Sequence, residues 1–103
     1  MATDKLTEPL SSLTDESRIA VSKDQVSCDL AGEAAILNLK NGVYYGLNPV
    51  GARIWALLQE PKTFAQIRDA LLDDYDVERL SLESDIRDLL NQLAAQGLVD
   101  IGS

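Results

Sequence analysis

The chain has 103 residues, 46% of them hydrophobic and 25% charged, which is typical of one globular domain. Seventeen acidic residues against nine basic ones give a net charge of −8, and the chain contains no histidine. These values argue against nucleic-acid binding, which needs Lys and Arg contacts with phosphates, and against catalytic triads and most zinc sites.

The first part of the chain differs in composition from the rest. Residues 1–17 are rich in Thr, Ser, Asp and Glu and include Pro9, which predicts a flexible tail and leaves residues 18–103 as one domain. The start lacks the basic and apolar segments of a signal peptide, and no apolar run approaches the roughly 18–20 residues of a membrane helix. With a single cysteine as well, the sequence predicts a cytoplasmic protein without internal disulfides.

Three short strands are expected next. Apolar residues alternate between Arg18 and Leu30, and further β-prone runs cover Ala34 to Leu39 and Val43 to Leu47. Cys28 lies within the first alternation, which predicts a small buried hydrophobic residue and not a reactive thiol. Asn41-Gly42 predicts a type I′ hairpin turn, because both central residues of that turn need a positive φ.

A two-residue turn at this position pairs Leu39 with Tyr44 and Leu37 with Gly46, and it leaves apolar side chains on both faces of the sheet. The strand from Val43 to Leu47 is uncharged and predicted to lie at an edge. Such an edge is an aggregation hazard unless something pairs with it, and adding a peptide strand is a common recognition mode. The residues alone do not decide between a sheet covered by the tail and a surface that awaits a partner.

Three helices should follow, starting at Asn48-Pro49, at the capping box Thr63 to Gln66, and at Ser81. They are expected to span about 49–59, 64–75 and 82–96, and residues 98–101 are expected to return as a strand. This order predicts an α+β fold in which a three-stranded antiparallel sheet precedes three helices, with the outline of a winged helix-turn-helix.

A winged helix suggests DNA binding, but the third helix carries Glu83, Asp85 and Asp88 against Arg87 alone. This charge contradicts contact with phosphates. The acidic stretch from Asp73 to Glu78 lacks the spacing and glycine of a calcium loop and is expected to be a solvated linker. We therefore predict no catalytic residue, metal site or cofactor.

The segment from Gly42 to Leu58, with its Tyr-Tyr-x-Leu-Asn-x-x-Gly-x-x-Ile-Trp pattern, resembles the PqqD-like family, as do residues 85–90 and 97–99. It is similar in particular to stand-alone PqqD-like proteins of lasso-peptide pathways, which are RiPP recognition elements. The resemblance implies a non-catalytic domain that binds the leader segment of a ribosomally made precursor as an added antiparallel strand. It also implies two further partners, a cysteine-protease-like leader peptidase and an ATP-dependent cyclase.

In such proteins the leader lies between the third strand and the third helix. On a helical wheel, Asp85, Asp88 and Gln92 lie together beside the apolar stripe, while Glu83 and Arg87 lie on the other flank. We favour the first flank, although the sequence does not decide this. The expected peptide-binding residues are Val43, Tyr44, Tyr45, Gly46, Leu47, Asp85, Ile86, Asp88, Leu89 and Gln92. The alternative function is an acidic winged-helix interaction or regulatory module without DNA binding.

Overall fold

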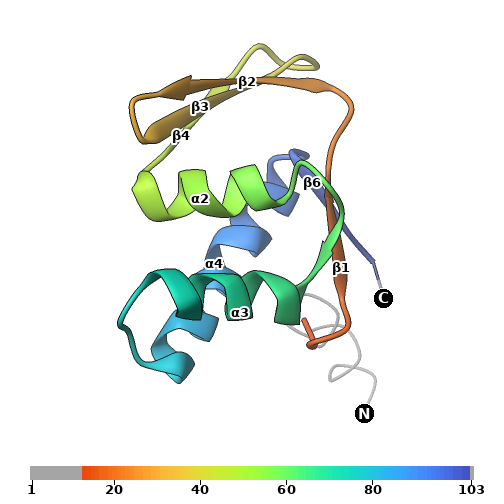
Figure 1. The fold of residues 1–103 in the computed structure, drawn as a ribbon. Helices are drawn as coiled ribbons and strands as arrows, with labels where there is room; N and C mark the ends of the chain where they lie inside the picture. The colour runs from red at the N-terminus through yellow and green to blue at the C-terminus, as the bar shows by residue number, and fades with distance from the viewer. Residues whose placement is uncertain (1–12, 103) are drawn as a thin grey trace.

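The computed structural model describes residues 13–102. The elements in chain order are β1 (Arg18–Val21), β2 (Gln25–Leu30), β3 (Glu33–Asn38), β4 (Tyr44–Leu47), α2 (Pro49–Leu57), β5 (Lys62–Thr63), α3 (Phe64–Asp74), α4 (Arg79–Ala95) and β6 (Val99–Gly102). The predicted α+β order, a three-stranded antiparallel sheet followed by three helices, is confirmed. Figure 1 shows this hairpin sheet lying over α2, with α3 on the other side of α2 and β1 running along one end of the helices.

The predicted first strand is in fact two strands in two different sheets. β2, β3 and β4 form one antiparallel sheet in that order, whereas β1 lies between β5 and β6 in a second small sheet. The chain leaves β1 at Ser22, where the Ser22 hydroxyl accepts a hydrogen bond from the backbone of Asp24. The predicted final strand exists as β6. The two-residue β5 was missed because it is too short to show any alternation.

The hairpin turn between β3 and β4 also differs from the prediction. A type I′ geometry occurs at Ala31-Gly32, with φ of 54° and 91°, and not at Asn41-Gly42. The backbone N–H of Asn38 donates to the Val43 carbonyl at 2.9 Å, so residues 39–42 form a longer loop.

This longer loop shifts the pairing by two residues, so Tyr44 pairs with Leu37, and Gly46 pairs with Ala35. The side chain of Asn38 accounts for the difference. Its Oδ1 accepts from the Lys40 N–H at 2.9 Å, and its Nδ2 donates to the Gln96 carbonyl at 2.8 Å. A shift of two residues leaves every side chain on its predicted face.

The helices follow the predicted caps except at α4. Asn48 and the Thr63–Gln66 capping box open α2 and α3 as expected. α4 begins before the predicted Ser81 cap, with Glu78 as an N-cap that makes no side-chain hydrogen bond. An Arg79–Glu83 ion pair of 3.3 Å, one helical turn apart, supports the additional residues.

One core lies between the inner face of the hairpin sheet and the three helices. Trp55 and Phe64 are buried in it, as predicted. Cys28 was predicted to be buried and is exposed, because the outer face of β2 has no element packed on it. The prediction was wrong because an alternating pattern does not reveal which face of a strand is covered.

The described part of the expected N-terminal tail packs on the domain. Leu13 contacts the core, and Ser17 is buried, with its carbonyl accepting a hydrogen bond from the Phe64 N–H at 2.9 Å. Asp15 pairs with the buried Arg68 at 2.9 Å. Residues 1–12 lie outside the described residues.

Candidate functional site

A groove of about 330 Å³ lies between the first turns of α2 and the first half of α4. It is closed at one end by the linker that joins α3 to α4. Its lining residues are Asn48, Val50, Gly51, Ile54, Tyr75, Val77, Ser81, Leu82, Asp85, Ile86 and Leu89. We refer to it below as the α2–α4 groove.

The sequence after β4 shapes one wall of this groove. The side chain of Asn48 accepts a hydrogen bond from the Gly51 N–H at 2.8 Å and so fixes the start of α2. A Cβ on Gly51 would lie 3.2 Å from Cδ2 of Leu47, so glycine lets α2 approach the end of β4 closely. Val50 and Val77 remain 37% and 48% exposed in the groove, which gives it an accessible apolar surface.

The predicted site residues on α4 divide into two groups. Asp85, Ile86 and Leu89 line the groove, whereas Asp88 and Gln92 lie outside its lining. Gln92 instead contacts β4, because its Oε1 accepts a hydrogen bond of 2.6 Å from the Tyr45 hydroxyl. The flank of α4 that carries Asp85, Asp88 and Gln92 therefore extends from the α2–α4 groove to β4.

The predicted strand residues Val43, Tyr44, Tyr45, Gly46 and Leu47 do not line the groove, but β4 leads directly into it at Asn48. β4 is an edge strand of the hairpin sheet, next to β3 alone. The edge strand therefore ends next to the groove, at Asn48.

The register shows which backbone groups of β4 point away from β3. Asn38 and Val43 form a hydrogen-bonded pair, and bonded pairs alternate along an antiparallel ladder. Ile36 and Tyr45 are then the next bonded pair. The N–H and C=O groups of Tyr44 and Gly46 consequently point outward, where another strand can pair with them.

The two flanks of α4 differ in their charge contacts. Glu83 is held by Arg68 at 3.1 Å and by Arg79 at 3.3 Å, and Arg87 lies 5.3 Å from the centre of the Phe64 ring. Within residues 13–102, Asp85 has no Lys or Arg nitrogen within 4.0 Å. The groove therefore presents an uncompensated negative charge.

Other classes of site find little support in the described residues. No group of three His, Cys, Asp or Glu side chains in residues 13–102 is placed to hold a metal ion. In the same part of the chain, no helix has the length and hydropathy needed to cross a membrane. The acidic stretch from Asp73 to Glu78 instead contributes Asp74 to an ion pair of 2.7 Å with Arg53.

Sequence reasoning missed the groove residues outside α4, chiefly Val50, Gly51, Tyr75 and Val77. Val50 could have been identified from the sequence, because it lies in the first turn of α2 and widens the apolar stripe of that helix. Tyr75 and Val77 lie in a linker that was interpreted from its acidic residues alone.

Comparison with known proteins gives consistent matches. The family model of coenzyme PQQ synthesis protein D (PqqD) matches residues 33–99. TbiB1, solved in complex with the TbiA(beta) leader peptide, superposes with a TM-score of 0.75 at 41% identity, covering 79% of this chain and 94% of that chain. A lasso peptide synthetase B1 complexed with the leader peptide superposes with a TM-score of 0.71 at 24% identity, covering 80% of this chain and 96% of the other, and supports the fold alone. No curated protein matches the chain significantly.

Proposed function

Because this chain belongs to the PqqD family, we propose that it binds the leader segment of a ribosomally made precursor peptide and catalyses no reaction itself. The leader adds an antiparallel strand to the edge of β4 and continues into the α2–α4 groove. The observation that carries this proposal is the outward-pointing backbone of Tyr44 and Gly46 beside an open apolar groove.

The chemistry of the path indicates what kind of peptide fits. The β4 edge offers hydrogen bonds to any extended backbone, at a net gain of about 0.5–1.5 kcal/mol each. Val50 and Val77 provide exposed apolar surface for leader side chains, and Asp85 favours a basic residue near the groove. From several backbone hydrogen bonds and one or two buried apolar side chains we expect micromolar binding, which corresponds to about −8 kcal/mol.

The partners beyond the leader follow from the resemblance to lasso-peptide pathways. A bound leader extends from the groove and carries the attached core segment to enzymes that act on it. We expect these to be a cysteine-protease-like leader peptidase and an ATP-dependent cyclase, in the cytoplasm where the precursor is made.

The proposal is tested by calorimetric titration with the leader of a short precursor reading frame sought beside the gene for this chain, and with the TbiA(beta) leader peptide as a second probe. We expect micromolar or tighter binding of the first leader, and none of a scrambled version. Val50→Asp places a charge in the groove and should weaken binding at least about tenfold, since it removes apolar contact and desolvates a carboxylate.

Val26→Asp is the matched control, because Val26 is also exposed but lies on β2, outside the groove. It should leave leader affinity unchanged. Failure of the folded chain to bind the first leader would overturn the proposal and favour an acidic interaction or regulatory module.

A further inference from the structure

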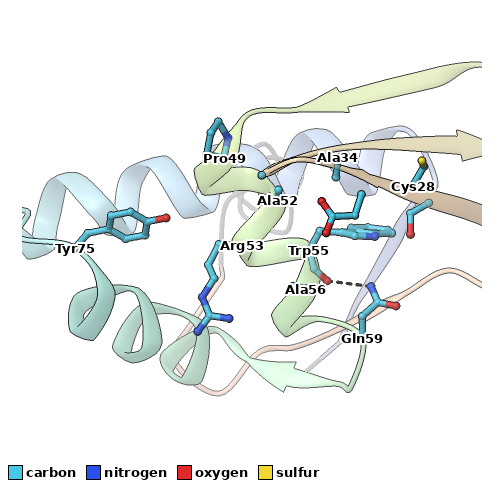
Figure 2. Close-up of a pocket in the computed structure, with 12 residues that line it drawn as sticks. Cys28, Ala34, Pro49, Ala52, Arg53, Trp55, Ala56, Gln59 and Tyr75 are labelled. Atoms are coloured by element: carbon cyan, nitrogen blue, oxygen red, sulfur yellow. Dashed lines mark hydrogen bonds between the residues drawn. The ribbon is translucent and has the colours of Figure 1, made fainter.

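A second pocket, of about 510 Å³, lies between α2 and the end of the hairpin sheet formed by β2 and β3 (Figure 2). From α2 it is lined by Ala52, Arg53, Trp55 and Ala56, whereas the α2–α4 groove is lined by residues 50, 51 and 54. At about 100° per residue, these two sets face opposite sides of the helix. The leader path and this pocket, which we call the Trp55 pocket, therefore lie on either side of α2, and their linings share Tyr75 alone.

Trp55 contributes its indole to the lining of this pocket. Its side chain is only 4% exposed, and within residues 13–102 its Nε1 has no hydrogen-bond partner. A buried indole N–H usually finds an acceptor, because leaving it unpaired costs about 1–3 kcal/mol. Nε1 is itself closed to solvent, so a ligand in the pocket meets the indole ring and not its N–H.

The rim of the pocket is negatively charged. Asp29 on β2 pairs in register with the buried Ala34, so its side chain lies on the face of the sheet that is turned toward α2. In the described part of the chain no Lys or Arg nitrogen lies within 4.0 Å of the Asp29 carboxylate. Arg53, also in the lining, is already paired with Asp74 at 2.7 Å. A ligand with a positive charge is favoured here.

The interior is apolar and matches a side chain in character. Ala34, Ala52 and Ala56 and the indole of Trp55 provide small and flat surfaces, and Figure 2 shows them gathered between α2 and the strands. The volume lies within the range of about 300–1,000 Å³ that is typical of ligand pockets. Two consecutive residues of a polypeptide can match this lining, one with an apolar side chain and the other with a basic side chain.

We propose that the Trp55 pocket docks a partner polypeptide by an apolar residue that is flanked by Lys or Arg. The apolar side chain enters the pocket beside the indole of Trp55, and the basic side chain pairs with Asp29. Since the pocket and the α2–α4 groove lie on opposite faces of α2 and share only Tyr75 in their linings, a leader and this partner bind at the same time. The site does not depend on the proposed leader binding.

The chain contains a single tryptophan, so its indole N–H gives one resonance in a ¹⁵N–¹H spectrum and reports on this site directly. The probe is the peptide acetyl-Gly-Leu-Lys-Gly-amide, titrated into the full chain. We expect the indole resonance to shift as the probe occupies the pocket, because the Trp55 ring forms part of its lining. Replacing Leu by Ser in the probe should weaken the response at least about tenfold, and replacing Lys by Glu should weaken it about two- to fivefold.

Two variants make the test specific. Ala56→Phe fills the pocket and should abolish the response, and Asp29→Lys should reverse the preference between the Lys and Glu probes. An indole resonance that stays unmoved by the Leu-Lys probe, or that moves equally with all three peptides, overturns the proposal. Neither Ala56 nor Asp29 lines the α2–α4 groove, so the Ala56→Phe and Asp29→Lys variants should bind the leader with the same affinity as the parent. If the chain binds the leader but the probe peptide does not move the indole resonance, only the proposal for the Trp55 pocket is rejected. If the probe moves the resonance but the leader does not bind, only the proposed leader site is rejected.

Discussion

The phenol of Tyr45 on β4 donates a hydrogen bond of 2.6 Å to Oε1 of Gln92 on α4, across 47 residues of sequence. This is a direct link between the strand edge and the helix that together border the proposed leader path. It fixes the separation of the two elements before any peptide binds. Preorganisation of this kind lowers the entropic cost of association.

Tyr45→Phe tests this role. Loss of the hydroxyl should reduce the free energy of unfolding by about 0.5–1.5 kcal/mol, as for other single hydrogen bonds, and should weaken leader binding by a similar free energy. Denaturant unfolding and calorimetry measure the two effects. Combining it with Gln92→Ala in a double-mutant cycle should show the coupling between the two side chains.

Tyr44→Phe is the matched control, since the Tyr44 side chain is 69% exposed on the outer face of the same strand. It should change neither quantity. If Tyr45→Phe and Gln92→Ala prove strictly additive, the link does not hold the two elements together in solution.

Asp85 provides a separate prediction about electrostatics. Asp85→Lys should slow association with a basic leader, and the rate should depend less on salt, because groove charges act mainly on encounter. Asp100→Lys on β6 makes the same change in net charge outside the groove and serves as the control. Stopped-flow rates at low and high salt measure both, and equal effects of the two variants would show that only total charge matters.

Arg68 is the buried charge on which the N-terminal segment depends. Burial of its guanidinium lowers the pKa, but hydrogen bonds to Asp69, Asp15 and Glu83 raise it more, so the pKa of Arg68 lies above its ordinary value. A raised pKa in the folded state means that this stabilisation is fully present below the ordinary pKa of arginine and is lost only as pH rises through the raised one. Deprotonation of Arg68 should therefore cause no loss of stability between neutral and mildly alkaline pH.

Arg68→Met should cost about 3 kcal/mol of stability, because the remaining carboxylates lose a cation whose side chain is only 7% exposed. Arg79→Met removes the second partner of Glu83, but the Arg79 side chain is 60% exposed, and the loss should stay below about 0.5 kcal/mol. Urea unfolding of both variants measures these two losses in the free energy of unfolding. Equal losses would mean that the buried ion pairs contribute no more than the exposed one.

The comparison of sequence and structure shows which signals are local. The caps at Asn48 and Thr63 and the apolar stripes of the helices act over a few residues, and the sequence predicted them correctly. The register of β4 was missed because it depends on Asn38, whose amide reaches the carbonyl of Gln96, 58 residues away. No pattern within the hairpin reveals that contact.

The candidate site shows the same difference between local signals, which the sequence reveals, and long-range contacts, which it does not. Helical spacing grouped Asp85 with Asp88 and Gln92 beside the apolar stripe, but of these three only Asp85 lines the groove, together with Ile86 and Leu89 of the stripe. The opposite wall consists of Val50, Gly51 and Ile54 on α2, and periodicity does not describe how α2 lies relative to α4. Cys28 was misjudged for a related reason, because its strand alternates although its outer face is uncovered.

The register turns the strand-addition proposal into a test on single backbone groups. Tyr44 N–H points away from β3, whereas Tyr45 belongs to a hydrogen-bonded pair with Ile36. Proline has no N–H, so Tyr44→Pro removes one donor from the leader and none from the sheet, and an edge strand tolerates it. It should weaken leader binding about threefold to tenfold, the equivalent of one hydrogen bond, with little change in circular dichroism.

Tyr44→Ala removes the same side chain but keeps the N–H, and it serves as the control for the loss of the ring. Tyr45→Pro should instead break the β3–β4 ladder and lower the stability of the whole domain. If Tyr44→Pro folds and binds the leader as tightly as Tyr44→Ala, the leader is not held by pairing with the edge of β4, and the binding path must lie elsewhere on α4.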